Sequence, residues 1–334
     1  MIFKIRTGRL FCRAEQKERL KIMMMLMELV LLAAGFFMLV KGADWFVDGT
    51  SGIADRLGVP QLVIGLTIVA MGTSAPEAAV SITAALKGSA EITIGNIVGS
   101  NILNILIILG ITSVIVSVAV AKSTIRYEIP YMMLITGVLW YMGYTGNVVT
   151  FAEGIVLWVL FFLYLAYLYV MAVRDKNMQV QEEEGAKPFW KLGLLALIGL
   201  ALIVWGSDVT VDAATAIAKQ LGLSERFIGL TIVALGTSLP ELFTSVSAAI
   251  KGKADIAIGN IVGSNIFNIL FVVGSAALIT PVTFQPNFLI DTLVAIGAGL
   301  LLLVCVARKQ LLVRWGGVLM LACYGGYFVY LLNC

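Results

Sequence analysis

The sequence predicts an all-α polytopic membrane protein of ten transmembrane helices, arranged as a 5+5 inverted-topology repeat. Two observations lead to this fold class. First, 60% of the 334 residues are hydrophobic and 13% are charged, whereas soluble chains carry about 25% charged residues. Second, the segment 65–110 recurs without a gap at 229–274, with 31 of 46 positions identical, which shared hydrophobicity alone does not produce. We call the constant spacing that pairs position 65 with position 229 the repeat offset.

The ten predicted helices are apolar runs long enough to cross a bilayer, which takes about 20 residues. They are 23–52, 61–86, 92–117, 127–144, 152–173, 190–216, 227–250, 256–280, 287–307 and 315–332. Since five helices per half is an odd number, the second half must cross the membrane in the opposite sense to the first. The predicted parts are a basic N-terminal extension (1–22), two five-helix repeats (23–173 and 190–334) and a polar loop between them (174–189).

The N-terminal extension allows two interpretations. Met23, Met24, Met25 and Met27 follow it directly, so the natural chain could start at one of them. Alternatively, the basic residues form an arm that lies on anionic lipid. Outside 1–22, the loops after odd-numbered helices carry 12 Lys and Arg and the loops on the other side carry three. The positive-inside rule then places the inter-repeat loop in the cytoplasm, but counting the extension removes most of this bias.

Each repeat places one glutamate, Glu77 or Glu241, inside an apolar helix directly after a proline. Proline in a helix interior lacks the N–H and opens the preceding turn. A break at membrane depth is tolerated only where it faces protein or a wet cavity. A carboxylate near the bilayer centre is costly and functional by default. Its recurrence in an inverted copy is typical of secondary transporters.

Polar residues with helical spacing surround these glutamates. Ala70, Thr73, Ser74 and Glu77 share one helix face, as do Ala234, Thr237, Ser238 and Glu241. The next helix of each repeat adds a stripe of amides and a serine: Asn96, Ser100, Asn101 and Asn104, then Asn260, Ser264, Asn265 and Asn268. Hard oxygen and amide groups suit Ca²⁺ and Na⁺ better than a soft transition metal. Taken singly, a hydroxyl in a membrane helix more often bonds its own backbone, and an asparagine is as often a link between helices as a ligand.

Two further acidic pairs, Asp44 with Asp48 and Asp208 with Asp212, are related by the repeat offset. Each pair has the i, i+4 spacing of one helix face and lies near the end of an apolar run. We therefore expect solvated helix ends rather than ion ligands at these positions.

The composition excludes several other classes. The chain has no histidine, so imidazole metal ligands and histidine proton relays are excluded, and carboxylates remain to titrate in the core. Four cysteines without pair spacing indicate neither a disulfide framework nor a zinc site. We expect no enzyme activity, no cofactor, no nucleic acid and no obligate protein partner. The expected partners are Ca²⁺, monovalent cations and membrane lipid.

The segments GTSAPE (72–77) and GTSLPE (236–241), with GNIVGSNILN (95–104) and GNIVGSNIFN (259–268), resemble the two α-repeats of the Ca²⁺/cation antiporter superfamily, which includes sodium/calcium exchangers. The resemblance covers all ten predicted helices and implies a prokaryotic exchanger in the plasma membrane. It implies ions held between helices two, three, seven and eight, with helices one and six sliding across them. The metal ligands it implies are Glu77, Glu241, Thr73, Ser74, Thr237, Ser238, Asn104, Asn268, Ser100, Ser264 and the backbone of Ala70 and Ala234.

One position departs from some of these relatives. Potassium-dependent exchangers carry Asp where this chain has Asn268, so the resemblance is to the potassium-independent branch. The function expected is Ca²⁺ export in exchange for Na⁺ by alternating access. A Ca²⁺/H⁺ antiporter that uses the same two glutamates stays open as an alternative. A cation channel is a weaker alternative, because one chain here supplies both halves of the site, whereas channels commonly surround a pore with several subunits.

Overall fold

The computed structural model describes residues 2–88, 90–174, 188–222 and 234–333, with no side-chain description for 2–22, 91, 234 and 333. The first half consists of helices and two short strands, in this order: α1 Ile2–Leu57, α2 Gln61–Ile64, η1 Gly65–Val69, α3 Ala70–Thr73, α4 Ala75–Leu86, α5 Glu91–Leu103, η2 Asn104–Leu109, α6 Gly110–Ile115, β1 Val118–Ala119, η3 Thr124–Glu128, α7 Ile129–Gly146, β2 Val148–Val149 and α8 Phe151–Arg174. The η segments are π-helical turns within longer helices.

As far as it is described, the second half repeats the same order except for η3, whose equivalent positions lie inside α15. Its elements are α9 Phe189–Gln220, α11 Ala234–Gly236, α12 Leu239–Ile250, α13 Ala254–Phe267, η5 Asn268–Val273, α14 Gly274–Ile279, β3 Val282–Thr283, α15 Pro286–Ala307, β4 Leu311–Leu312 and α16 Arg314–Asn333. The π-helical turns η2 and η5 begin at Asn104 and Asn268, which the repeat offset pairs, so the repeat extends to this local irregularity. Such turns occur frequently at functional sites.

The chain is a multi-pass helical membrane protein. Within the described residues, seven helices are long and apolar enough to span a bilayer, and the bent pair Gln61–Thr73 and Ala75–Leu86 makes an eighth. The predicted fourth span is present as α7, whose 18 residues include three tyrosines and three glycines; it is not among the eight. The predicted seventh span is interrupted after Gly236, and its first part, 227–233, lies outside the described residues.

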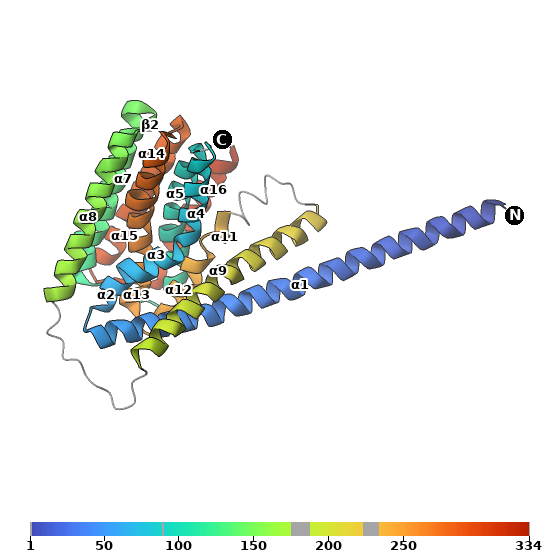
Figure 1. Ribbon diagram of the computed structural model, residues 1–334, viewed down its shortest axis with the longest axis horizontal. Coiled ribbons are helices and arrows are strands. Elements are labelled where there is room, and N and C mark those ends of the chain that lie inside the picture. The colour runs from blue at the N-terminus through green and yellow to red at the C-terminus, as the bar shows by residue number, and fades with distance from the viewer. Residues whose placement is uncertain (1, 89, 175–187, 223–233, 334) are drawn as a thin grey trace.

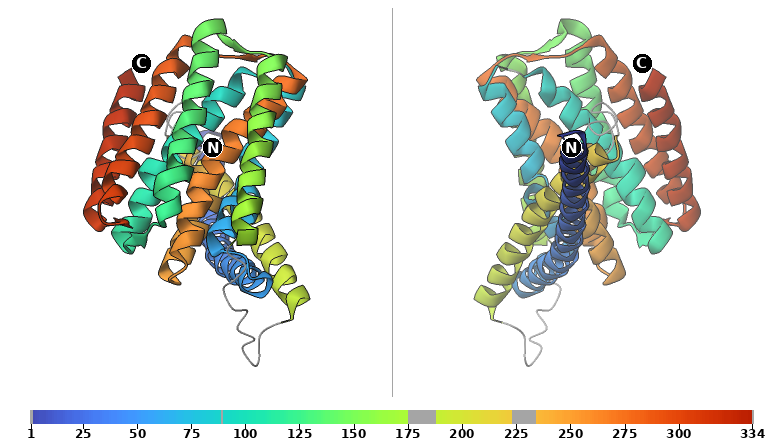
Figure 2. Two further views of the ribbon diagram at one scale, coloured as in Figure 1. Left: turned by 90° about the vertical axis from the view of Figure 1, so that its left-hand side faces the viewer. Right: turned by 90° about the vertical axis from the view of Figure 1, so that its right-hand side faces the viewer.

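Two short antiparallel bridges join the halves. β1 pairs with β4 and β2 pairs with β3. The repeat offset converts β1 into β3 and carries β2 to within one residue of β4, so each bridge is the counterpart of the other. Figure 2 shows α8 and α16, which are also counterparts, at opposite edges of the molecule. The two halves are thus related as a pair around a common centre.

That centre is formed by the third and eighth predicted helices. In the spans Ile92–Ile115 and Ala254–Ile279, 78% and 94% of the most apolar stretch is buried, compared with 11% in Met23–Leu57. α13 packs against η1 and α3 of the other half. The long helices α1 and α9 lie side by side along one face of the molecule (Figure 1). Their contact is close, because a Cβ at Gly199 would lie 2.5 Å from the Phe46 backbone nitrogen.

Candidate cation site

Each buried glutamate stands at the start of a restarted helix. Ser74 and Ser238 leave helical geometry, with φ/ψ of −81°/8° and −91°/3°, and α4 and α12 begin directly after them. Pro76 and Pro240 occupy the first turn of the new helix, where the missing N–H has no partner to lose. The first broken helix bends by 51°. The carboxylates of Glu77 and Glu241 are then held at the break, and both residues are only 1% exposed.

The carboxylate of each half meets the hydroxyl groups of the other half. Ser74 Oγ donates to Glu241 Oε1 at 2.9 Å, and Thr73 lies beside the same carboxylate. On the other side, Thr237 and Ser238 lie beside Glu77, although Ser238 Oγ makes no hydrogen bond within the described residues. The two glutamates are also near enough to repel one another when both are ionised. The break in each half therefore contributes to one shared cluster rather than to two separate ones.

Two asparagines attach the glutamate helices to the central helices. Asn96 Nδ2 donates to Ser81 Oγ at 2.9 Å and to the Glu77 carbonyl at 3.3 Å. Asn260 Nδ2 makes the equivalent bonds in the second half, to Ser245 Oγ at 2.9 Å and to the Glu241 carbonyl at 3.4 Å. Asn260 Oδ1 additionally accepts from Thr73 Oγ1 at 2.9 Å. These bonds fix the backbone at each glutamate and link the two halves.

A second network joins four asparagines at the crossing of α5 and α13. Asn101 Nδ2 donates to the Asn265 carbonyl and Asn265 Nδ2 donates to the Asn101 carbonyl, each at 3.1 Å. Asn104 Nδ2 donates to Asn265 Oδ1 at 2.9 Å, and Asn268 Nδ2 donates to Asn101 Oδ1 at 3.1 Å. Because the amide nitrogens of Asn104 and Asn268 are engaged in this way, the amide oxygens are the free ends of both side chains.

The cluster contains buried oxygen acceptors without a donor. Among the described residues, Glu77 Oε2, Glu241 Oε2, Asn104 Oδ1 and Asn268 Oδ1 are buried and accept no hydrogen bond. Buried acceptors left unpaired are costly, and a cation supplies what all four lack. Carboxylate, amide and carbonyl oxygens are the ligands of Ca²⁺. No group of three or more His, Cys, Asp or Glu that could hold a metal ion occurs among the described residues.

The structure brings together most of the residues that the sequence singled out. Ala70 takes part through its carbonyl, which accepts from Thr73 Oγ1 and from Ser264 Oγ, both at 3.4 Å. Ser100 is buried on α5 with 4% of its surface exposed. Ala234 begins α11 and is described only by its backbone.

The sequence patterns did not identify two serines that help to position the glutamate helices. Ser81 and Ser245 each follow their glutamate by four positions and receive the amide of Asn96 or Asn260. The signal was available, because both serines are retained in the repeat on the glutamate face.

Asp44 and Asp48 are partly solvated, with side chains 36% and 50% exposed, but they also form an ion pair that the sequence did not predict. Both contact Lys251, which follows α12, through its ammonium group. The ion pair depends on tertiary structure, because α12 packs along α1. A contact between segments so far apart in the chain cannot be predicted from the local sequence.

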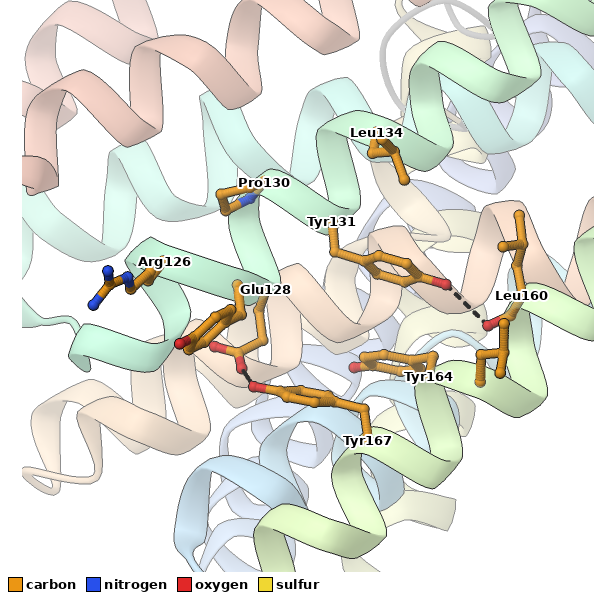
Figure 3. A pocket seen from close by; sticks show the side chains of 10 residues that line it. Arg126, Glu128, Pro130, Tyr131, Leu134, Leu160, Tyr164 and Tyr167 are labelled. Atoms are coloured by element: carbon orange, nitrogen blue, oxygen red, sulfur yellow. Dashed lines mark hydrogen bonds between the residues drawn. The ribbon is translucent and has the colours of Figure 1, made fainter.

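A separate cavity of about 460 Å³ lies between α7 and α8 and is lined by tyrosines and leucines (Figure 3). Tyr131 and Tyr164 stack at its wall with ring centroids 5.8 Å apart, and Tyr167 donates to the buried carboxylate of Glu128. Tyr164 OH donates to the carbonyl of Leu66 at 3.3 Å. This cavity therefore contacts the bent helix through η1 but shares no side chain with the glutamate cluster.

Comparison with known proteins agrees with this geometry. A family model described as "Sodium/calcium exchanger protein" matches residues 27–170 and again residues 191–333. The putative antiporter CaxA of Alkalimonas amylolytica is 42% identical over 263 residues, covering 77% of this chain and 82% of that protein. The inner membrane protein YrbG of Escherichia coli is 37% identical over 323 residues, covering 92% and 96%. The solved structure of the sodium–calcium exchanger NCX_Mj, soaked without Na⁺ and Ca²⁺, superposes with a TM-score of 0.79 at 32% identity, covering 92% and 99%.

Proposed function

Because the chain belongs to the sodium/calcium exchanger family, an antiporter family, we propose that it exports Ca²⁺ in exchange for Na⁺ by alternating access. The observation that carries the proposal is the cross-repeat cluster, in which two buried glutamates face hydroxyls of the opposite half. It lies in the middle of broken membrane helices, where transporters of this kind bind their ions. The similarity to NCX_Mj supports Na⁺ as the counter-ion.

We assign the ligands as the sequence suggested. Glu77 and Glu241 supply two negative charges, which neutralise one Ca²⁺. The amide oxygens of Asn104 and Asn268 and the backbone carbonyl of Ala70 supply neutral oxygens. The remaining proposed ligands are Thr73, Ser74, Thr237, Ser238, Ser100, Ser264 and the backbone of Ala234. About six to eight oxygens at roughly 2.3–2.6 Å are typical of Ca²⁺, and this set is large enough to provide them.

The negative charge of the site explains why such a carrier would exchange cations across the membrane rather than let them leak through it. Without a cation, two carboxylates stand close together away from water, and that is strongly unfavourable for a closed, dehydrated intermediate. One Ca²⁺ or monovalent cations remove the repulsion, so the loaded carrier passes through the closed state and the empty carrier rarely does. The transport of Ca²⁺ is then coupled to that of the counter-ion without any additional structural element.

The proposed architecture is ten spans in two inverted five-helix repeats. It is supported by the constant repeat offset, the exchanged β bridges and the double match of the family model. We place the protein in the inner membrane of a prokaryote, as the similarity to YrbG suggests. The inter-repeat loop is placed in the cytoplasm on the strength of the Lys and Arg bias outside residues 1–22.

The experiment that tests the function is uptake of radioactive calcium into proteoliposomes under an imposed Na⁺, K⁺ or H⁺ gradient. We expect uptake that saturates with Ca²⁺ and depends on an outward Na⁺ gradient. Uptake driven by H⁺ alone would replace Na⁺ by H⁺ as the counter-ion at the same two glutamates. Uptake that needs no counter-ion and does not saturate would identify a channel instead.

A further inference from the structure

A polar contact ties α12 to α1 at one end of the molecule. Lys251 Nζ lies 2.7 Å from Asp48 Oδ1 and 3.5 Å from Asp44 Oδ1, and it donates to the Asp44 carbonyl at 2.8 Å. Ser247 Oγ donates to Asp44 Oδ1 at 2.8 Å. We call these four residues the Lys251 latch.

The sequence contains a second copy of this latch. The repeat offset pairs Asp44, Asp48, Ser247 and Lys251 with Asp208, Asp212, Thr83 and Lys87. The second set therefore has the same charges, the same i, i+4 pair of aspartates and a hydroxyl four positions before the lysine. We call it the Lys87 set. It belongs to α4 and α9, the counterparts of α12 and α1.

In this structure, the lysine and threonine of the Lys87 set do not bind its two aspartates. All four of its residues are exposed. Within the described residues, no ion pair or side-chain hydrogen bond joins Lys87 or Thr83 to Asp208 or Asp212. One half of the molecule thus makes a contact that its counterpart does not make.

The helices show the same asymmetry. α12 packs along α1, whereas α4 has no comparable contact with α9. The rings of Phe36 and Phe243 meet across α1 and α12 with centroids 6.1 Å apart. Thr244 on α12 is fully buried, and its counterpart Val80 on α4 is 44% exposed. α12 is therefore covered by α1 at the Lys251 end, whereas α4 is not covered in the same way by α9 at the Lys87 end.

We propose that Lys251 and Lys87 are positioning residues for ion exchange, which hold the α1–α9 pair against the core alternately. In the state shown here, Lys251 binds Asp44 and Asp48. In the opposite state, α9 packs along α4, Lys87 binds Asp208 and Asp212, and the Lys251 latch is released. The inference rests on the proposed alternating-access function, since inverted repeats exchange roles between the two states of a carrier.

The chemistry of the latch suits a contact that opens in every cycle. The latch is partly exposed, with side-chain exposures of 26% for Lys251 and 50% for Asp48. Ion pairs of this kind contribute little individually, so neither state is trapped. Lysine is a compact charge with three donors on a flexible stem, and it can therefore bridge two aspartates that lie one helical turn apart.

Two disulfide traps test the proposal in the full-length protein without its native cysteines. The first variant carries Asp44→Cys and Ser247→Cys, and the second carries Asp208→Cys and Thr83→Cys. We expect the first pair to cross-link readily without transported ions. We expect the second pair to cross-link only when Na⁺ and Ca²⁺ allow turnover, and each cross-link to stop Ca²⁺ exchange until it is reduced. A second pair that never cross-links while the unoxidised variant still exchanges Ca²⁺ would overturn the latch and leave the function intact.

Charge removal gives a readout that a merely structural contact does not predict. Lys251→Gln should raise the rate of cross-linking of the Asp208–Thr83 pair by about two- to fivefold, the range for an exposed ion pair. Lys87→Gln should lower it by a similar factor. Lys253→Gln is the matched control, because this neighbouring lysine makes no ion pair with the described residues. Effects of the same sign for both lysines would overturn the alternation.

Discussion

The internal repeat makes equivalent side-chain contacts at the centre of the molecule and different side-chain contacts at its two ends. At the centre, the bonds between Asn101 and Asn265 are reciprocal, with both distances 3.1 Å. At the ends, Lys251 binds Asp44 and Asp48, while its counterpart Lys87 is exposed and makes no ion pair with Asp208 or Asp212 within the described residues. The same repeated sequence thus gives a symmetric asparagine network at the centre and asymmetric contacts at the ends.

This difference explains why a carrier benefits from an inverted repeat. A site built equally from both halves offers the same ligands to an ion arriving from either side. In a carrier that works by the alternating access proposed above, asymmetric ends exchange roles in a second state. The asymmetric ends and the symmetric asparagine network are what this proposal predicts for one site that serves both states.

The largest expected effect comes from removing one charge at the symmetric centre. Glu77→Gln and Glu241→Gln each preserve shape but leave a divalent cation half neutralised. Breaking a buried charge pair costs about 3–5 kcal/mol, so we expect Ca²⁺ exchange to fall by about 100-fold or more. The measurement is Na⁺-driven Ca²⁺ uptake in proteoliposomes, and the equivalent positions of the two glutamates in the repeat predict a large loss at both.

Glu153→Gln is the matched control for both variants. Glu153 is at the start of α8, where it accepts from the backbone and hydroxyl of Thr150 at the protein surface. Its uptake should stay near the wild-type rate. A folded Glu77→Gln or Glu241→Gln protein that exchanges Ca²⁺ as fast as this control would disprove the shared site.

The next effect concerns the amide network. Asn101→Ala and Asn265→Ala each remove the acceptor that orients the amide of Asn268 or Asn104. Groups that orient a metal ligand contribute about 10- to 100-fold to metal affinity, so we expect at least about a tenfold loss of Ca²⁺ affinity in each variant. Calorimetric titration of purified protein with Ca²⁺ measures it. Unequal losses in the two variants would show that the centre is less symmetric in function than in structure.

A smaller effect on stability tests the contact between α1 and α9. At Gly199 an added Cβ would meet Phe46 N at 2.5 Å and the Gly42 carbonyl at 2.7 Å. Such overpacking costs about 1–3 kcal/mol, so Gly199→Ala should lower the thermal unfolding midpoint in detergent. Gly193→Ala is the control on the same helix, because a Cβ there meets nothing within 4 Å. Equal thermal unfolding midpoints for the two variants would contradict the close packing of α1 against α9.

The sequence alone predicted the centre better than the ends. Repetition reveals which residues are equivalent, so Glu77 and Glu241 could be paired before any coordinates were known. The proline after Ala75 predicted the break that the structure places at Ser74. The family and the helical membrane class followed from the same segments. The ligand roles themselves are still predictions.

The ends could not be predicted because a repeat describes two equivalent halves and not the state in which they differ. Asp44 and Asp208 have the same local sequence environment, and only the packing of α12 on α1 distinguishes them. The cross-repeat bond from Ser74 to Glu241 joins groups 167 positions apart in the chain, a relation that helical spacing does not contain. Likewise, α7 was expected as a span by length, but its tyrosines and glycines reduce its apolar character.

The smallest effect is expected from Asn268→Asp, which sharpens the comparison by adding one charge to one half of the centre. The swap is nearly isosteric, so the bond to Asn101 is the main contact at risk. A third carboxylate in a site that holds two must be protonated or must attract another cation. We expect a change of a few-fold in exchange rate that depends on pH or on K⁺, measured as Ca²⁺ uptake from about pH 6 to 9 with and without K⁺. Asn104→Asp should behave alike, because its amide oxygen is likewise buried and unpaired. Exchange that is insensitive to both conditions in either variant would place these asparagines outside the ion site and leave them as links between helices.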